Sequence, residues 1–110
     1  MNAEQLAYEV KELIHKHRDE TCEVYNRQTA CHYVRVYERK KSYSVLAWAI
    51  SDLDDPSDDD LMNKVAKFLV SKNITVGKQG FEIKRNEPFE SNHNKKWGGV
   101  TRNIIVRIAK

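Results

Sequence analysis

Residues 43–50 read Tyr-Ser-Val-Leu-Ala-Trp-Ala-Ile, a stretch with apolar side chains at nearly every position. A strand that leaves one face in water alternates apolar and polar residues, whereas a strand covered on both faces is apolar throughout. We therefore expect residues 43–50 to form a central strand, covered by helices on one face and at least partly on the other. The segments on either side indicate what pairs with this strand and what covers it.

Four further segments have the character of strands. Residues 31–38 and 100–109 alternate between two faces, as half-buried strands do. Residues 81–85 form a shorter strand, and residues 21–26 are the weakest of the candidates. We expect all of them to join the sheet that contains residues 43–50.

Two segments have the pattern of amphipathic helices. Residues 2–18 and 57–72 place apolar side chains three and four positions apart, the spacing of a helix with one buried face. Asn2 is suited to cap the first helix, with Gln5 three residues on, and Asn73 is suited to end the second in left-handed conformation. The predicted buried stripes are Leu6, Val10, Leu13, Ile14 and His17 in the first helix, and Leu61, Val65, Phe68 and Leu69 in the second.

The predicted fold class is α+β, with the element order α-β-β-β-α-β-β. A chain of 110 residues fits one domain, so we assign residues 1–110 to a single one. Helices with one apolar stripe must cover an apolar sheet face. We therefore expect a mainly antiparallel sheet with both helices packed on one face.

The chain shows no sequence feature of membrane insertion or export. No apolar run approaches the roughly 20 residues that span a bilayer, and the first residues lack the basic-then-apolar order of a signal peptide. We therefore predict a cytoplasmic location. In that compartment Cys22 and Cys31 would be thiols, although the spacing leaves a disulfide across the intervening turn open.

The charge is distributed unevenly along the chain. The net charge of +3 combines −3 over residues 1–71 with +6 over residues 72–110. A basic half on a small domain suits an anionic partner, although scattered lysines also serve solubility.

The segment 87–99 is the clearest candidate for a contact surface. Loops longer than about 12 residues in small domains are usually functional or flexible, and this one contains Lys95, Lys96 and Trp97 before two glycines. Lysines can neutralise phosphates and a tryptophan can stack on an unpaired base. Our leading hypothesis is a non-enzymatic module that binds nucleic acid there. The residues assigned to this contact are Arg39, Lys40, Lys41, Arg85, His93, Lys95, Lys96, Trp97 and Arg102.

The alternative is a small accessory or inhibitor protein that docks on a larger complex through an aromatic sheet face. Its candidate anchors are Tyr33, Tyr37, Tyr43 and Trp48, because aromatic residues and arginine dominate protein interfaces. Self-association through the same face or a strand edge, as a homodimer, is left open. The position of the aromatic residues distinguishes the two hypotheses. Aromatic residues on an uncovered sheet face favour a protein partner, whereas aromatic residues around the basic loop favour nucleic acid.

Motifs for metals, cofactors or catalysis do not emerge. Residues 52–60 are rich in Asp, but the EF-hand pattern fails at its sixth and twelfth positions, Ser57 and Asn63. Cysteine and histidine spacings do not match a structural zinc site, and glycine-rich phosphate loops and hydrolase motifs are absent from the sequence. We predict no metal, no cofactor and no enzymatic activity, and we assign the aspartates to the helix dipole.

Helix, three strands and helix is also the element order of the double-stranded-RNA-binding domain. In that domain the second helix presents lysines at its start to phosphates. This chain has Asp58, Asp59 and Asp60 there, which would repel a phosphate, and two further strands follow. We therefore assign no family on the shared order.

Overall fold

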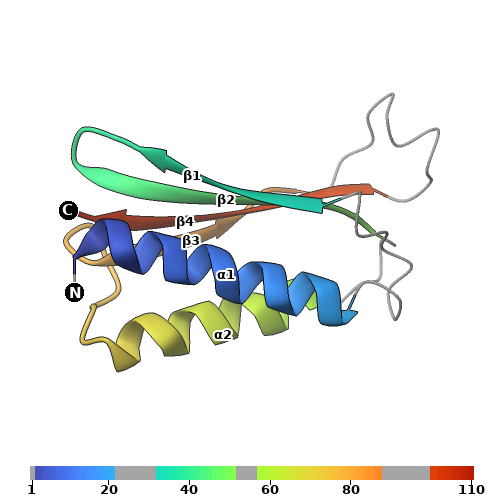
Figure 1. The fold of residues 1–110 in the computed structure, drawn as a ribbon, viewed down its shortest axis with the longest axis horizontal. Helices are drawn as coiled ribbons and strands as arrows, with labels where there is room; N and C mark the ends of the chain where they lie inside the picture. Colours follow the sequence, from blue (N-terminus) through green and yellow to red (C-terminus); the bar gives the residue numbers. More distant parts are fainter. Residues whose placement is uncertain (1, 22–31, 52–56, 88–99) are drawn as a thin grey trace.

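The computed structural model describes residues 2–21, 32–51, 57–87 and 100–110. Two helices and four strands lie in these ranges, and they confirm the predicted α+β class (Figure 1). The elements are α1 (Ala3–Thr21), β1 (His32–Glu38), β2 (Ser42–Ser51), α2 (Ser57–Ser71), β3 (Phe81–Arg85) and β4 (Val100–Ala109).

The four strands form one antiparallel sheet in the order β1-β2-β4-β3. The apolar strand β2 is central, as its sequence predicts, and it pairs with β4 from Ser42 opposite Ala109 to Ser51 opposite Val100. Each described strand begins and ends within one residue of its predicted bounds. Alternating side chains define β1 and β4, and a continuous apolar run defines β2, so the local sequence pattern was sufficient to find them.

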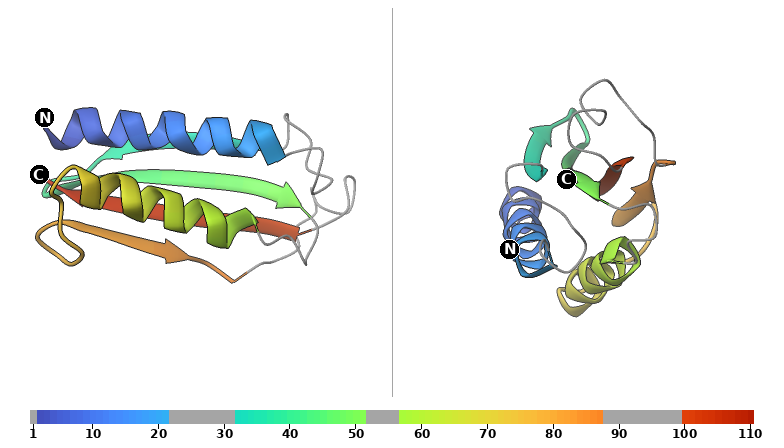
Figure 2. Two further views of the ribbon diagram at one scale, coloured as in Figure 1. Left: turned by 90° about the horizontal axis from the view of Figure 1, so that it is seen from below. Right: turned by 90° about the vertical axis from the view of Figure 1, so that its right-hand side faces the viewer.

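Both helices cover the same face of the sheet, as the two views of Figure 2 show. That face receives alternate side chains from every strand, because successive residues in a strand point to opposite sides. The apolar stripes of α1 and α2 pack against these strand side chains. The buried cluster comprises Leu6, Ala7, Val10, Ile14, Val34, Val45, Ala47, Leu61, Val65, Leu69, Phe81, Ile104, Val106 and Ile108.

The start of α1 is as predicted, but its end is not. The Oδ1 atom of Asn2 accepts a hydrogen bond of 2.7 Å from the backbone N–H of Gln5, which confirms the cap. The helix continues to Thr21, three residues past the predicted end, and the Thr21 hydroxyl donates to the carbonyl of His17. Thr21 therefore belongs to a helix and not to the predicted strand 21–26, the rest of which lies outside the described residues. The described order is α-β-β-α-β-β.

The end of α2 follows the sequence prediction. Asn73 has a φ of 64°, the left-handed conformation expected of a residue that ends a helix. The N–H of Ile74 then returns to the carbonyl of Leu69, which satisfies one of the last free carbonyls of the helix. In the described ranges neither helix is long and apolar enough to cross a membrane.

Candidate functional site

The face of the sheet turned away from the helices carries the main candidate site. No described helix lies over it (Figure 2). We call this surface the open face and define it by the strand residues that alternate with the core residues. They are Tyr33, Arg35, Tyr37, Ser44, Leu46, Trp48, Glu82, Lys84, Asn103, Ile105 and Arg107.

An aromatic pair lies at one end of the open face. Tyr33 of β1 stands directly opposite Trp48 of β2, and their rings stack with centroids 5.1 Å apart and an angle of 22° between the planes. Directly opposed residues of antiparallel strands are close enough for such contact. The guanidinium of Arg35 lies 5.1 Å from the centroid of Tyr33, whose side chain is 37% exposed. Aromatic and cationic side chains thus meet at the surface.

An apolar centre adjoins this pair. The strand register places Leu46 and Ile105 side by side on the two central strands. Arg35 pairs with Leu46 and Lys84 pairs with Ile105, so the four residues form one row across the sheet with the two cations at its ends. Leu46 and Ile105 are half-buried, whereas both cations are exposed. An apolar centre with a polar rim is the anatomy of a protein interface. Our sequence interpretation counted Lys84 among the basic residues beside the segment 87–99 but missed Arg35, Leu46 and Ile105, although Arg35 shares the strand parity of Tyr33 and could have been found from it.

The one acidic residue of the open face is engaged by Arg107. The Glu82 carboxylate accepts two hydrogen bonds from the Arg107 guanidinium, of 2.9 and 2.6 Å. These residues border a shallow pocket of about 220 Å³ beside Ile105. Because Glu82 and Arg107 neutralise each other, Arg35 and Lys84 carry the charges of the open face that no described residue balances, and both are positive.

Tyr43 does not belong to the open face. It shares the helix-covered face with Val45 and packs against the core, because positions 43 and 48 differ by an odd number and point to opposite sides. Its hydroxyl lies within hydrogen-bond distance of Glu4 and Glu38, at 3.1 and 3.3 Å. Burial, then the bond to Glu4 and the charge of Glu38, raise the pKa of Tyr43 to about 12. Of the four proposed aromatic anchors, Tyr33, Tyr37 and Trp48 therefore remain on the open face.

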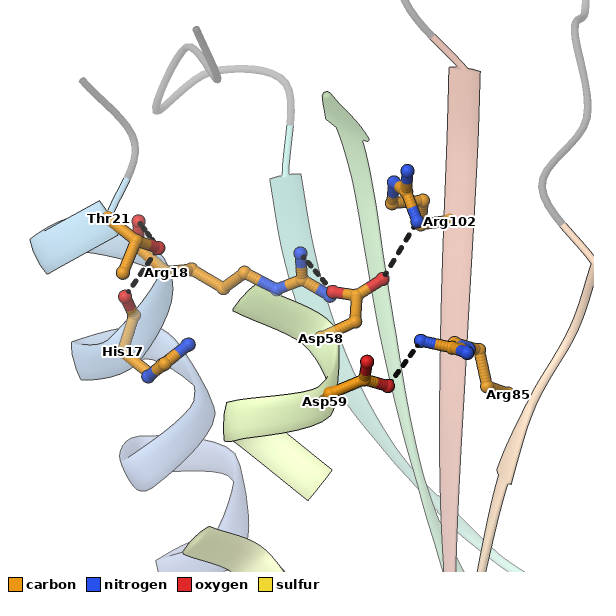
Figure 3. Close-up of polar contacts among 7 residues, drawn as sticks. All are labelled: His17, Arg18, Thr21, Asp58, Asp59, Arg85 and Arg102. Carbon is orange, nitrogen blue, oxygen red and sulfur yellow. Dashed lines mark hydrogen bonds and ion pairs between the residues drawn. The ribbon is translucent and has the colours of Figure 1, made fainter. Parts of the chain in front are cut away.

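Arg85 and Arg102, assigned above to the base of a phosphate-binding loop, both contact aspartates at the start of α2 (Figure 3). Arg102 is 4% exposed, and its Nη1 atom lies 3.8 Å from Oδ2 of Asp58. Arg85 is partly exposed and lies 2.7 Å from Asp59. Arg102 thus faces the interior, which argues against a contact between its guanidinium and a phosphate at the surface.

The predicted basic residues that the structure describes fall at opposite ends of the sheet, with Arg39, Lys40 and Lys41 at one end and Arg85 and Arg102 toward the other. The segment 88–99 follows β3 and precedes β4, whereas Arg39, Lys40 and Lys41 connect β1 to β2 at the other end, where Ser42 pairs with Ala109. Ten residues of β2 separate the two ends, which corresponds to about 30 Å. His93, Lys95, Lys96 and Trp97 lie outside the described residues. The basic turn therefore does not adjoin the strand ends that flank the segment 88–99.

Over the described part of the chain, no three or more His, Cys, Asp or Glu side chains are grouped so that they could hold a metal ion. In comparisons with known proteins, no family model, curated protein or solved structure matches this chain. The function must therefore be inferred from the geometry of the molecule.

Proposed function

We infer that this chain is a non-enzymatic docking module that binds an acidic protein segment through the open face. The observation that carries this proposal is the stacked Tyr33–Trp48 pair on the face that neither described helix covers, with the Arg35 guanidinium over the tyrosine ring. By the criterion stated from the sequence, aromatic residues on an uncovered sheet face favour a protein partner. A cytoplasmic location, as predicted above, belongs to the same proposal.

The physical case rests on the kinds of side chain that meet there. Tyrosine, tryptophan and arginine are enriched among the residues that dominate binding energy in protein interfaces. Stacking between Tyr33 and Trp48 restricts both rings before a partner arrives, which lowers the entropy lost on binding. Leu46 and Ile105 supply a dry centre beside the pair.

The charge of the open face favours an acidic partner. Arg35 and Lys84 are exposed and stand at opposite ends of one row, whereas Glu82 is held by Arg107. Complementary charge accelerates association and disfavours wrong partners more than it adds affinity. We therefore expect binding to slow at higher salt, with the aromatic pair supplying most of the affinity.

The chain contains a matched pair for the decisive control. Tyr8 on α1 is 50% exposed and has the Lys11 ammonium 5.9 Å from its ring centroid, so it reproduces the Tyr33–Arg35 pair on a helix. We propose capture of partners from a nuclease-treated cell lysate with the wild-type protein and with four single variants. Two variants change the open face, Tyr33→Ala and Arg35→Glu. The other two change the helix pair, Tyr8→Ala and Lys11→Glu. Each captured protein is then purified, and its affinity for the wild-type chain and for each of the four variants is measured directly.

The proposal expects a nuclease-resistant partner with an acidic segment. Its affinity should fall about tenfold or more with either open-face variant, in line with hot-spot losses above about 1.4 kcal/mol. Equal affinities for the open-face and helix variants would refute the assignment of the open face.

Nucleic-acid binding through the strand–loop–strand of residues 81–109 is the second candidate. It is supported by the net charge of +6 over residues 72–110 and by the partly exposed Arg85 at the end of β3. Lys95 and Lys96 would neutralise phosphates and Trp97 would stack on a base.

Trp48→Phe leaves Trp97 as the only tryptophan, so its fluorescence reports on the loop alone. This variant is titrated with single- and double-stranded oligonucleotides at low and moderate salt. Saturable quenching that weakens steeply with salt, and that the double change Lys95→Ala and Lys96→Ala reduces, is the expected result. No response at micromolar concentrations and low salt would leave the protein partner as the only candidate.

A further inference from the structure

A lysine-rich hollow lies at the end of the sheet where β1 turns into β2. Its volume is about 580 Å³, and it is open to solvent. We call it the lysine hollow. Its lining residues are Lys40, Lys41, Lys78, Gln79, Ala109 and Lys110. It shares no residue with the Tyr33–Trp48 pair or with the row from Arg35 to Lys84.

Three segments that are far apart in the sequence assemble this hollow, and backbone hydrogen bonds hold them together. The N–H of Lys110 donates to the carbonyl of Lys41, and the N–H of Ala109 donates to the carbonyl of Gly80. The two distances are 3.0 and 2.8 Å. The lysines therefore project from a fixed backbone and not from a loose tail.

The turn that carries Lys78 and Gln79 is also fixed. The Nη2 atom of Arg107 donates to the carbonyls of Gly77 and Lys78, at 3.1 and 3.0 Å. A Cβ atom on Gly80 would lie 1.8 Å from the carbonyl oxygen of Thr75, so only glycine fits there. This close approach makes the turn tight, and the bonds from Ala109 and Arg107 hold it against β4, with Lys78 beside the β1–β2 turn.

Neighbouring acids balance only part of the charge of the hollow. Lys110 forms an ion pair with Glu38, with 2.9 Å between Nζ and Oε2. Within the described ranges, Lys40, Lys41 and Lys78 form no ion pair, and no acidic residue lines the hollow. Like charges gathered in one place repel each other, and a bound anion would remove that repulsion.

We propose that the lysine hollow binds clustered phosphate groups, two or more on one polyanion. Lysine ammonium groups bind phosphates as point charges, without the bidentate geometry that the planar fork of arginine offers to a single carboxylate or phosphate. The Gln79 amide adds neutral donors beside them. Because the hollow is open, it suits a phosphate-bearing chain or an oligophosphate more than an enclosed small molecule.

The test compares two triple variants with the same change in net charge. One combines Lys40→Ala, Lys41→Ala and Lys78→Ala. The other combines Lys16→Ala, Lys67→Ala and Lys72→Ala, which are exposed lysines on α1, on α2 and directly after α2. Wild-type protein and both variants are titrated by calorimetry with sodium tripolyphosphate, with a 12-nucleotide single strand and, as a control for weak anion binding, with sulfate.

The expected result is saturable binding of tripolyphosphate, the oligonucleotide or both, and no saturable binding of sulfate. The hollow variant should bind about tenfold or more weakly, and for the oligonucleotide its log–log salt slope should flatten by about 0.7 per lost contact. Binding of both probes indicates recognition of any clustered phosphates. Binding of one indicates the free oligophosphate or the nucleic-acid backbone as the source.

The proposal is overturned if neither probe binds, or if both triple variants lose affinity equally. It is also independent of the two functions proposed above. Tyr33→Ala, and the double change Lys95→Ala and Lys96→Ala, should leave tripolyphosphate binding unchanged. Oligonucleotide binding that depends on Lys95 and Lys96, together with tripolyphosphate binding that the hollow variant does not weaken, would support the loop and refute the hollow.

Discussion

The Oδ1 atom of Asp58 lies 3.1 Å from Nη1 of Arg18, and both side chains are almost completely buried. Asp58 stands in the first turn of α2 and Arg18 in the last turns of α1, so this ion pair joins the two helices at one end of the molecule (Figure 3). Arg102 of β4 approaches the other carboxylate oxygen. One aspartate thus connects both helices to the sheet.

Replacing Asp58 should be strongly destabilising. Asp58→Ala leaves the two buried guanidinium groups without this carboxylate, and breaking a buried ion pair in this way costs about 3–5 kcal/mol. Urea unfolding followed by circular dichroism measures the loss. Asp60→Ala, an exposed aspartate in the same turn, should cost less than about 1 kcal/mol through the helix dipole. Similar losses for the two variants would contradict the role of Asp58.

The neighbouring pair Arg85–Asp59 should matter far less for stability. Its atoms are 2.7 Å apart, but the two side chains are 39% and 66% exposed. Water and salt screen such pairs, which typically contribute about 0–1 kcal/mol. We expect Arg85→Ala to lower the free energy of unfolding by less than about 1 kcal/mol, with a smaller effect at 0.5 M salt. A loss as large as that of Asp58→Ala would show that this pair acts as part of the buried cluster.

Acid should weaken the contact between Glu38 and Lys110. The hydrogen bond and charge of Lys110 lower the pKa of Glu38 below its ordinary value of 4.5. A carboxyl group with a lowered folded-state pKa stabilises the fold above its unfolded pKa, and this contribution is lost as the pH falls through the folded value. Melting temperatures between pH 7 and pH 2.5 should therefore depend less on pH in Glu38→Gln. The exposed Glu12→Gln serves as the control, and identical pH dependence in the two variants would be contrary to this expectation.

Alkali should act on Tyr43 in the opposite sense. Burial and the bonds to Glu4 and Glu38 raise the pKa of its phenol from 10.0 to about 12. A group with a raised folded-state pKa stabilises the fold below its unfolded pKa, and this contribution is lost as the pH rises from about 10 to about 12. In an absorbance titration at phenolate wavelengths, one tyrosine should ionise last, and Tyr43→Phe should remove that step. Tyr8→Phe should leave it in place.

The predictions of single helices and strands succeeded because each depends on interactions between residues that are close in the sequence. Alternating side chains identified 100–109, and three- and four-residue spacing identified 57–72, each within one residue of the observed bounds. Asn2 and Asn73 were read from local backbone chemistry, and both are confirmed. The end of α1 was missed by three residues, and its last turn holds Arg18, whose buried partner lies forty residues further on.

Part of the candidate site was also within reach of the sequence. The parity of strand positions places Tyr33, Arg35 and Tyr37 on one face and separates Tyr43 from Trp48. Parity does not say which strands are neighbours. The Tyr33–Trp48 stack and the row from Arg35 to Lys84 require the order β1-β2-β4-β3, which depends on how all four strands assemble.

By itself, then, the sequence determined the α+β class, the described strands and the helices, because periodicity and capping act between residues a few positions apart. Only the tertiary structure decided that Asp58 is a buried partner of two arginines and that Arg102 is withdrawn from the surface. It also placed Lys78 and Lys110 beside Lys40 and Lys41. These relationships join residues tens of positions apart, and their energies arise only when burial removes the charges from water and sheet pairing brings the segments together.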